Sequence, residues 1–137
     1  MAQTPTNPDG PEAMTRLILT DGRYPLDAFE FLHEGLELAA RTRYGEKPAA
    51  EGGHRHVSGE QLCQSLRKHA LRRWGPLART VLAHWGIHST MDFGEMVYLL
   101  VDNGFMQKTD EDSIEDFRDV FDFKQALRVR PRYELKD

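Results

Sequence analysis

The residue types best suited to chemistry in this sequence, His54, His56 and Cys63, gather in one short stretch. Imidazole nitrogen and thiolate sulfur are the ligands of tetrahedral zinc sites with three or four protein groups. Two histidines at i and i+2 of an extended loop can face one ion. However, no CxxC or HExxH motif accompanies them, and Cys63 falls on the apolar stripe of the next expected helix. The pattern favours two loop histidines and a small core cysteine. A metal site at His54 and His56 remains an alternative hypothesis.

A second pattern, Glu30-Phe31-Leu32-His33, has the Glu-x-x-His spacing that occurs in di-iron helical bundles. Such bundles need the motif on two helices, with further carboxylates on two others, and this sequence contains one copy. Cys63 as a nucleophile would need exposure and a nearby base. GxSxG, P-loop and GxGxxG motifs are absent from the sequence. We therefore expect no catalytic residues, no cofactor and no enzymatic activity.

Charge is strongly segregated along the sequence. Residues 59–79 hold five basic residues against one acidic residue, a net charge of +4, whereas residues 109–122 hold seven acidic residues against one basic residue, a net charge of −6. A basic helix face can bind phosphate backbones or an acidic protein, and an acidic surface suits a basic partner. The interaction candidates are Arg67, Lys68, Arg72 and Arg73 on the basic side, with Asp110, Glu111 and Asp112 on the acidic side. The simpler alternative is that the two segments face each other or water.

The composition is that of one soluble globular domain. The chain has 137 residues, of which 39% are hydrophobic and 29% charged, and its net charge of −4 gives no global case for nucleic-acid binding. The single cysteine excludes an intramolecular disulfide and is compatible with a reducing compartment. No segment combines a basic start with an apolar run, so we expect a cytoplasmic protein with no membrane partner.

Periodicity and end signals predict four helices. The first begins at Pro25 and ends at Gly45, with Phe31 and Leu38 lying off its apolar face. Ser58 and Gln61 form a capping-box pattern that opens a helix ending at Gly75. The other two helices cover residues 76–85 and 90–103. The last is apolar nearly all round, so we expect it to be buried, including Phe93, Val97, Leu100 and Val101. We also expect Trp74 of the second helix and Leu77 and Trp85 of the third to point inward.

The two ends of the chain are expected to contribute less to the folded core. Residues 1–20 form a predicted flexible leader, residues 21–129 a single helical domain and residues 130–137 a tail. Apolar and polar residues alternate near 105–108 and 120–123, which predicts a hairpin whose acidic connection carries a helical turn capped by Asp112 or Ser113. The predicted fold is therefore mainly α (α+β), a bundle of about four helices with a small C-terminal β-hairpin.

The order of three helices and a hairpin resembles a winged helix, as an analogy. A helix-turn-helix reader needs a polar or basic last helix, but the helix at 90–103 carries Asp92, Glu95 and Asp102. Such a helix would repel phosphates. We therefore expect the arrangement to serve packing or protein recognition.

Longer motif strings carry a family resemblance. They are HVSGEQL, ALRRWGPLARTVLAHWGIHSTMDFGEMVYLLVDNG, KTDEDSIEDF and RYPLDAFEFLHEGL. In these strings the sequence resembles a family of small uncharacterised bacterial proteins, described as conserved hypothetical, over about residues 23–123. The resemblance implies a compact domain of unknown function and no functional residues.

The leading hypothesis from the sequence is a non-enzymatic protein-interaction domain. It depends on the absence of a convergent catalytic set and on Phe31 and Leu38 as apolar residues outside the main helix face. The alternative is a nucleic-acid-binding domain that uses the basic helical face at 64–79. The second alternative is a metal-binding protein that uses His54 and His56. The sequence leaves the partner, the pathway and the oligomeric state open.

Overall fold

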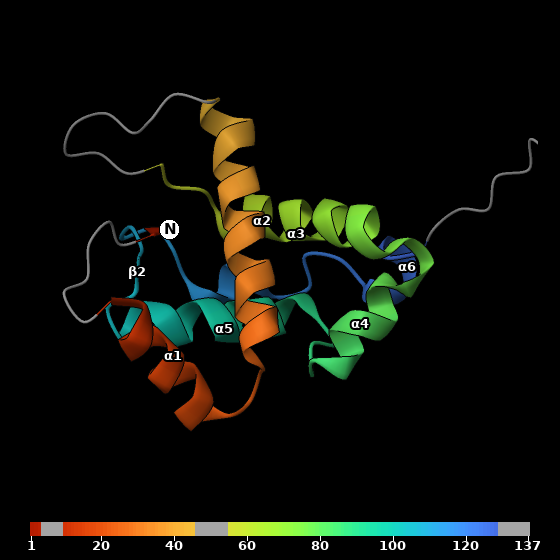
Figure 1. The fold of residues 1–137 in the computed structure, drawn as a ribbon. Coiled ribbons are helices and arrows are strands. Elements are labelled where there is room, and N and C mark those ends of the chain that lie inside the picture. Colours follow the sequence, from red (N-terminus) through yellow and green to blue (C-terminus); the bar gives the residue numbers. More distant parts are fainter. Residues whose placement is uncertain (4–9, 46–54, 129–137) are drawn as a thin grey trace, which may run out of the picture.

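The computed structural model describes residues 1–3, 10–45 and 55–128, and this part of the chain is mainly helical (Figure 1). The main helices are α1 (Gly10–Asp21), α2 (Leu26–Tyr44), α3 (Gly59–Trp74), α4 (Ala78–His84) and α5 (Thr90–Asp102), with a last short helix α6 (Phe123–Ala126). The remaining elements are the strands β1 (Ala2–Gln3) and β2 (Met106–Gln107) and the 3₁₀ turns η1 (Gly75–Leu77) and η2 (Ile114–Phe117). The predicted class, mainly α with one small antiparallel sheet, is confirmed.

The helix boundaries follow from local end signals. Pro25 precedes α2, and the Ser58 hydroxyl accepts a hydrogen bond from the Gln61 N–H while the Gln61 side chain accepts one from the Ser58 N–H. Gly45 and Gly75 follow α2 and α3 with φ of 77° and 52°, a region that favours glycine. No helix in the described part of the chain is long and apolar enough to cross a bilayer.

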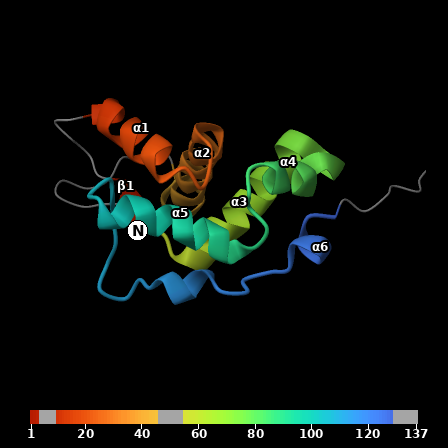
Figure 2. The ribbon, with the colours of Figure 1, turned by 90° about the horizontal axis from the view of Figure 1, so that it is seen from below.

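The core lies where α2 crosses α3 and α5 (Figure 1). Phe93, Val97 and Leu100 of α5 are buried as predicted, but Val101 is only half-buried because it lies at the outer edge of the helix. The C-terminal segment with η2 runs along the side of α5 and α3 opposite to α1 and α2 (Figure 2). The middle helices are therefore covered from both sides.

The small sheet differs from the predicted hairpin. Strand β2 pairs in antiparallel register with β1, which places Ala2 opposite Gln107 and Gln3 opposite Met106. Residues 120–123 do not return as a strand, because Phe123 begins α6 and packs its ring on Phe93 at 5.8 Å. Residues 104–123 therefore supply no wing of a winged helix. The helical turn capped by Ser113 is present as η2.

The expected flexible leader at residues 1–20 is wrong for the residues that the structure describes there. Residues 10–21 form α1, and Ile18 is buried against the core. Met1 is also buried, with its ammonium donating to the carbonyl of Val57 at 2.9 Å. The buried side chains of Ile18 and Met1 therefore pack α1 and the first residues of the chain against the domain. The predicted tail at 130–137 lies outside the described residues.

Two side-chain placements also need correction. Phe31, expected outside the apolar face, is fully buried because its ring packs on Trp74 at 5.1 Å and on Trp85 at 5.9 Å. Leu77, expected inward, is 61% exposed because η1 interrupts the helical phase before α4. The two tryptophans lie inward as predicted and meet edge to face at 5.4 Å.

Candidate binding groove between α2 and α3

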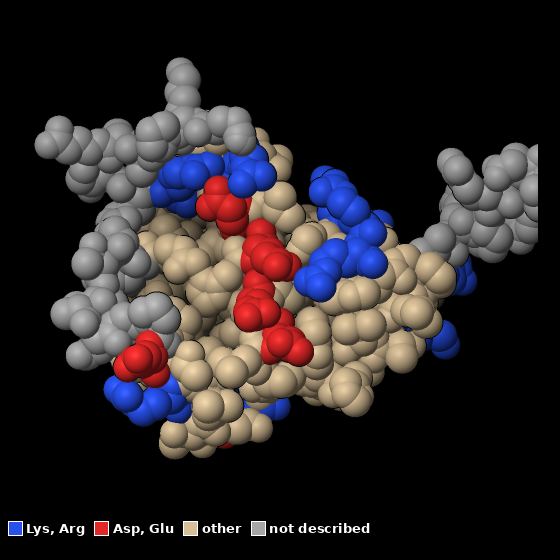
Figure 3. Space-filling model, viewed as in Figure 1, with Lys and Arg blue, Asp and Glu red and all other residues tan. Residues whose placement is uncertain are grey.

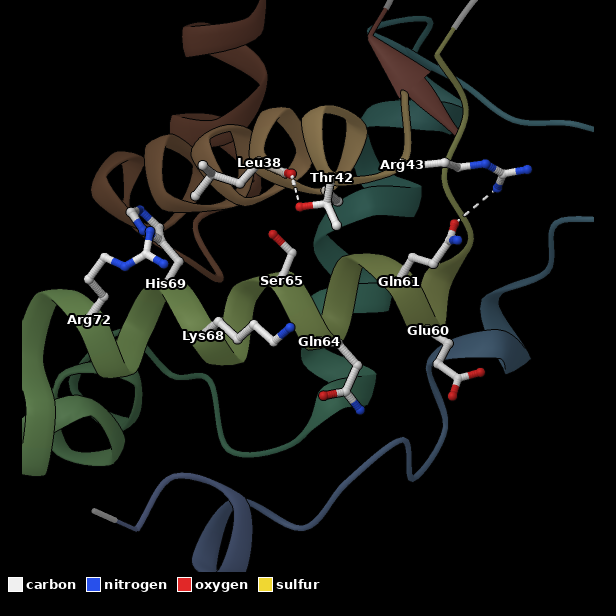
Figure 4. A pocket seen from close by; sticks show the side chains of 11 residues that line it. Leu38, Thr42, Arg43, Glu60, Gln61, Gln64, Ser65, Lys68, His69 and Arg72 are labelled. Atoms are coloured by element: carbon white, nitrogen blue, oxygen red, sulfur yellow. Dashed lines mark hydrogen bonds between the residues drawn. The ribbon is translucent and has the colours of Figure 1, made fainter. Parts of the chain in front are cut away.

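A groove of about 590 Å³ lies between the C-terminal half of α2 and the outer face of α3 (Figure 4). We call it the basic groove. Its α2 side is lined by Leu38, Ala39, Thr42 and Arg43. Its α3 side is lined by Glu60, Gln61, Gln64, Ser65, Lys68, His69 and Arg72.

Close contact between the two helices sets the position of the groove. Gly35 has no side chain where Leu66 crosses α2, and the Ser65 hydroxyl donates to the Gly35 carbonyl at 2.7 Å. At one end of the groove, the Arg43 guanidinium donates to the Gln61 side-chain oxygen at 3.1 Å, as Figure 4 shows. The same oxygen caps α3, so one amide fixes both the helix start and the groove end.

His69 forms the other end of the groove, next to Arg72. Its ring stacks on the buried ring of Phe31, with centroids 5.4 Å apart and planes 8° apart. Its Nε2 lies 2.8 Å from a Glu34 oxygen, and a carboxylate can only accept, so Nε2 carries the proton. Nδ1 is buried and has no hydrogen-bond partner within the described residues. The imidazole is thus held rigidly between the core and the groove.

The groove carries more positive than negative charge. Arg43, Lys68 and Arg72 line it against a single carboxylate, Glu60, whose side chain points away from α2 in Figure 4. Lys68 and Arg72 stand one turn apart on α3, are exposed, and form no ion pair within the described part of the chain. Between the charged ends lie the half-buried Leu38 and the buried Ala39. The groove can therefore hold an anionic group over a small apolar floor.

The four basic residues predicted as one face have separate roles. The Arg67 Nε donates to the Ala126 carbonyl at 3.0 Å and so fastens α6 to α3. Arg73 donates to Glu34 at 3.1 Å and lies over the Trp74 ring at 4.8 Å. Lys68 and Arg72 remain turned toward solvent in the groove.

The acidic candidates do not meet the basic helix. Asp110 and Glu111 are exposed, whereas Asp112 accepts hydrogen bonds from the Met1 ammonium and from the Thr109 N–H, both at 2.9 Å. Burial acts to raise the pKa of Asp112, but these hydrogen bonds outweigh it and lower the pKa below its usual value. In the described residues, no acid of 109–122 forms an ion pair with Arg67, Lys68, Arg72 or Arg73.

The metal candidates are not brought together in the described residues. His54 lies outside them, and no three His, Cys, Asp or Glu side chains among the described residues are grouped to hold a metal ion. Cys63 is fully buried, as its place on the apolar stripe predicted. Burial, with a smaller contribution from Glu60, raises the pKa of the Cys63 thiol to about 12, so it stays protonated at neutral pH.

Sequence reasoning identified Lys68 and Arg72 but missed Arg43, Gln64, Ser65 and His69 as neighbours of the same groove. Helical spacing shows which residues share one face of α3, but the crossing of α2 over α3 is a tertiary feature with no local pattern. Gly35, inside an otherwise regular helix, was the available signal for a close helix crossing.

The chain was also compared with protein-family models, with curated proteins and with solved structures, and none of them matches. The resemblance to a family of small bacterial proteins therefore stays a prediction. The function must be argued from the groove itself.

Proposed function

We propose that this chain is a non-enzymatic protein-interaction domain whose basic groove binds an acidic segment of a partner protein. The observation that carries the proposal is the pair Lys68 and Arg72, one helical turn apart, exposed, and without an ion pair in the described residues. Their charges are available to a ligand. A partner carboxylate would gain charge-assisted hydrogen bonds from both.

The shape of the groove supports a helical ligand. Two helices form its long walls, and an amphipathic helix laid between two helices buries its apolar side while its polar side meets the rim. Leu38 and Ala39 offer an apolar floor, and Gln64 and Ser65 offer polar contacts along the α3 wall. An acidic amphipathic helix fits this combination of charge and floor.

The surroundings of the groove disfavour nucleic acid, the alternative function. Glu30, Glu34 and Glu37 lie exposed along the adjoining surface of α2, where they would repel a long phosphate backbone. Arg67 and Arg73 already donate hydrogen bonds to Ala126 and Glu34, so only two of the four predicted basic residues face solvent without such a contact in the described residues. A short acidic segment can avoid the α2 carboxylates, whereas an extended polyanion cannot.

The test uses a synthetic helical peptide of about twelve residues with glutamates on one face and leucines on the other. Calorimetry should detect binding to the intact chain at low ionic strength. The variant Lys68→Gln/Arg72→Gln should bind at least about tenfold more weakly, because two charge-assisted contacts are lost. The matched control, Lys108→Gln/Lys124→Gln, removes the same charge from exposed positions outside the groove and should bind normally.

Two comparison ligands make the result specific. A peptide with lysines in place of the glutamates should not bind in the groove, so the Lys68→Gln/Arg72→Gln variant should not weaken any binding of it. A DNA duplex should bind more weakly than the acidic peptide under the same conditions. The proposal is wrong if the acidic peptide does not bind or if both double variants lose binding equally. A duplex that binds more tightly than the peptide would favour the nucleic-acid alternative.

A further inference from the structure

Two oppositely charged patches lie side by side on one face of the molecule, as Figure 3 shows. The acidic stripe runs along α2 and consists of Asp27, Glu30, Glu34 and Glu37, which are all exposed. The basic patch, on the C-terminal half of α3, consists of Lys68, Arg72 and Arg73. The Glu34–Arg73 ion pair, at 3.1 Å, is the point where the two patches touch.

Each patch is only partly neutralised by the residues that the structure describes. Glu34 pairs with Arg73 and contacts His69, and Glu37 pairs with Arg41 and Arg55. Asp27 and Glu30, at the N-terminal end of the stripe, have no ion pair among the described residues, and the same holds for Lys68 and Arg72. Within the described ranges, the face therefore presents two carboxylates and two cations without an ion pair.

We propose that a second copy of this chain covers this face in a two-fold symmetric dimer. A two-fold axis that passes between two complementary patches on one face brings each patch onto the opposite patch of the other copy. Asp27 and Glu30 of each copy then face Lys68 and Arg72 of the other. The same contact is made twice, so complementarity on a single chain is sufficient.

The dimer also regulates access to the basic groove. Lys68 and Arg72 line the groove, so a second copy that neutralises them competes with an acidic segment for the same two cations. This inference does not require that such a segment exists. Because exposed ion pairs are weak and each copy carries a net charge of −4, the association is weak and depends steeply on salt.

Charge exchange tests the geometry directly. The variant Asp27→Lys/Glu30→Lys reverses the two charges of the acidic stripe that are unpaired in the described residues, and Lys68→Glu/Arg72→Glu reverses the two such charges of the basic patch. In sedimentation experiments at about 0.01 M salt, where the Debye length is about 30 Å, the wild-type chain should dimerise and each variant alone should be monomeric. An equimolar mixture of the two variants should dimerise, because both contacts are then attractive again. Wild-type dimerisation should weaken at least about tenfold at 0.15 M salt, where the Debye length is about 8 Å.

Matched variants separate the patches from net charge. Asp110→Lys/Glu111→Lys changes the charge as much as the first variant, and Lys108→Glu/Lys124→Glu as much as the second, at exposed positions outside both patches. Each control should dimerise more tightly than the variant it matches. Glu30→Lys alone, outside the first turn of α2, guards against a variant that fails to fold at the helix start, and it should weaken the dimer while leaving the circular dichroism spectrum unchanged.

The outcomes also distinguish this inference from the proposed function. A wild-type chain that stays monomeric at low salt, a variant mixture that stays monomeric, or controls that lose the dimer as fully as the patch variants would each overturn the dimer. Binding of the glutamate peptide by a monomeric protein would leave the proposed function standing alone. Failure of the glutamate peptide to bind the monomeric Asp27→Lys/Glu30→Lys variant, which keeps Lys68 and Arg72, would leave the dimer standing without the proposed function.

Discussion

Two buried hydroxyl groups on α5, those of Thr90 and Tyr98, differ in their hydrogen bonding. Thr90, fully buried at the start of α5, donates from its hydroxyl to the Phe117 carbonyl at 2.6 Å and accepts from the Val120 N–H at 3.1 Å. The Tyr98 hydroxyl is buried without a hydrogen-bond partner in the described part of the chain. Nothing in the local sequence indicates that Thr90 bonds to a segment some thirty residues further along the chain.

Replacing Thr90 by Val should destabilise the protein by about 1–3 kcal/mol, because the shape is kept while the Phe117 carbonyl and the Val120 N–H lose their partner. Urea unfolding followed by circular dichroism measures the difference. Thr80→Val, at an exposed position of α4, is the control and should change the stability by less than about 0.5 kcal/mol. Equal effects of the two substitutions would contradict the role assigned to Thr90.

Replacing Tyr98 by Phe should leave the stability unchanged or raise it by up to about 1 kcal/mol, because it removes a buried donor that has no acceptor. Burial, together with the charges of Asp112, Asp116 and Asp102, raises the pKa of Tyr98, so the phenol is neutral at pH 7 in any case. The same urea experiment applies. A loss comparable to that of Thr90→Val would mean that the hydroxyl has a partner in solution.

At the scale of elements, α2 and α3 were predictable because their end signals are local, whereas α1 was not. Pro25, Ser58 with Gln61, and the glycines at 45 and 75 set the ends of α2 and α3 where the structure has them. The strands were not predictable in the same way, because β2 pairs with residues 2–3 at the opposite end of the chain. A two-residue strand has too little alternation to identify its partner.

The crossing of α2 and α3 depends on Gly35. A Cβ there would fall 2.9 Å from the Leu66 Cγ and closer still to its Cδ2. Gly35→Ala should therefore destabilise by about 1–3 kcal/mol, although alanine favours a helix by about 1 kcal/mol. Leu66→Ala alone should cost about 2–5 kcal/mol, since Leu66 is fully buried.

The double variant Gly35→Ala/Leu66→Ala is the decisive measurement for this contact. The added methyl group enters the space that the leucine leaves, so the double variant should be more stable than the sum of the single effects by at least about 1 kcal/mol. Additive effects in urea unfolding would show that the two side chains do not compete for the same space. Because the crossing of α2 and α3 positions the basic groove, binding of the acidic peptide should also be measured in the double variant.

At the scale of the whole molecule, the charge pattern was predictable but its internal partners were not. Residues 109–122 are acidic in sequence and mostly exposed in the structure, as expected. Asp112 is the exception, because it joins the Thr109 turn to the Met1 ammonium. Likewise, Lys68 and Arg72 were identified by helical spacing, whereas their position beside the α2 carboxylates required the helix crossing. The sequence therefore indicated which residues carry charge, but not which distant residues they lie beside in the fold.

Asp112→Asn should therefore destabilise the protein by about 1–3 kcal/mol at pH 7, because charge-assisted hydrogen bonds to two backbone groups are weakened. The pKa of Asp112 is lowered in the folded state, so its contribution is fully present above the unfolded-state value of about 4 and is lost as the pH falls through the lower folded-state value. The difference in unfolding free energy between wild type and variant should accordingly shrink on acidification below about pH 4. Asp110→Asn/Glu111→Gln, at the exposed neighbouring positions, should leave the stability unchanged across the same range. A difference for Asp112→Asn that stays constant down to acid pH would mean that the carboxylate charge does not hold the first residues of the chain to the 109–112 turn.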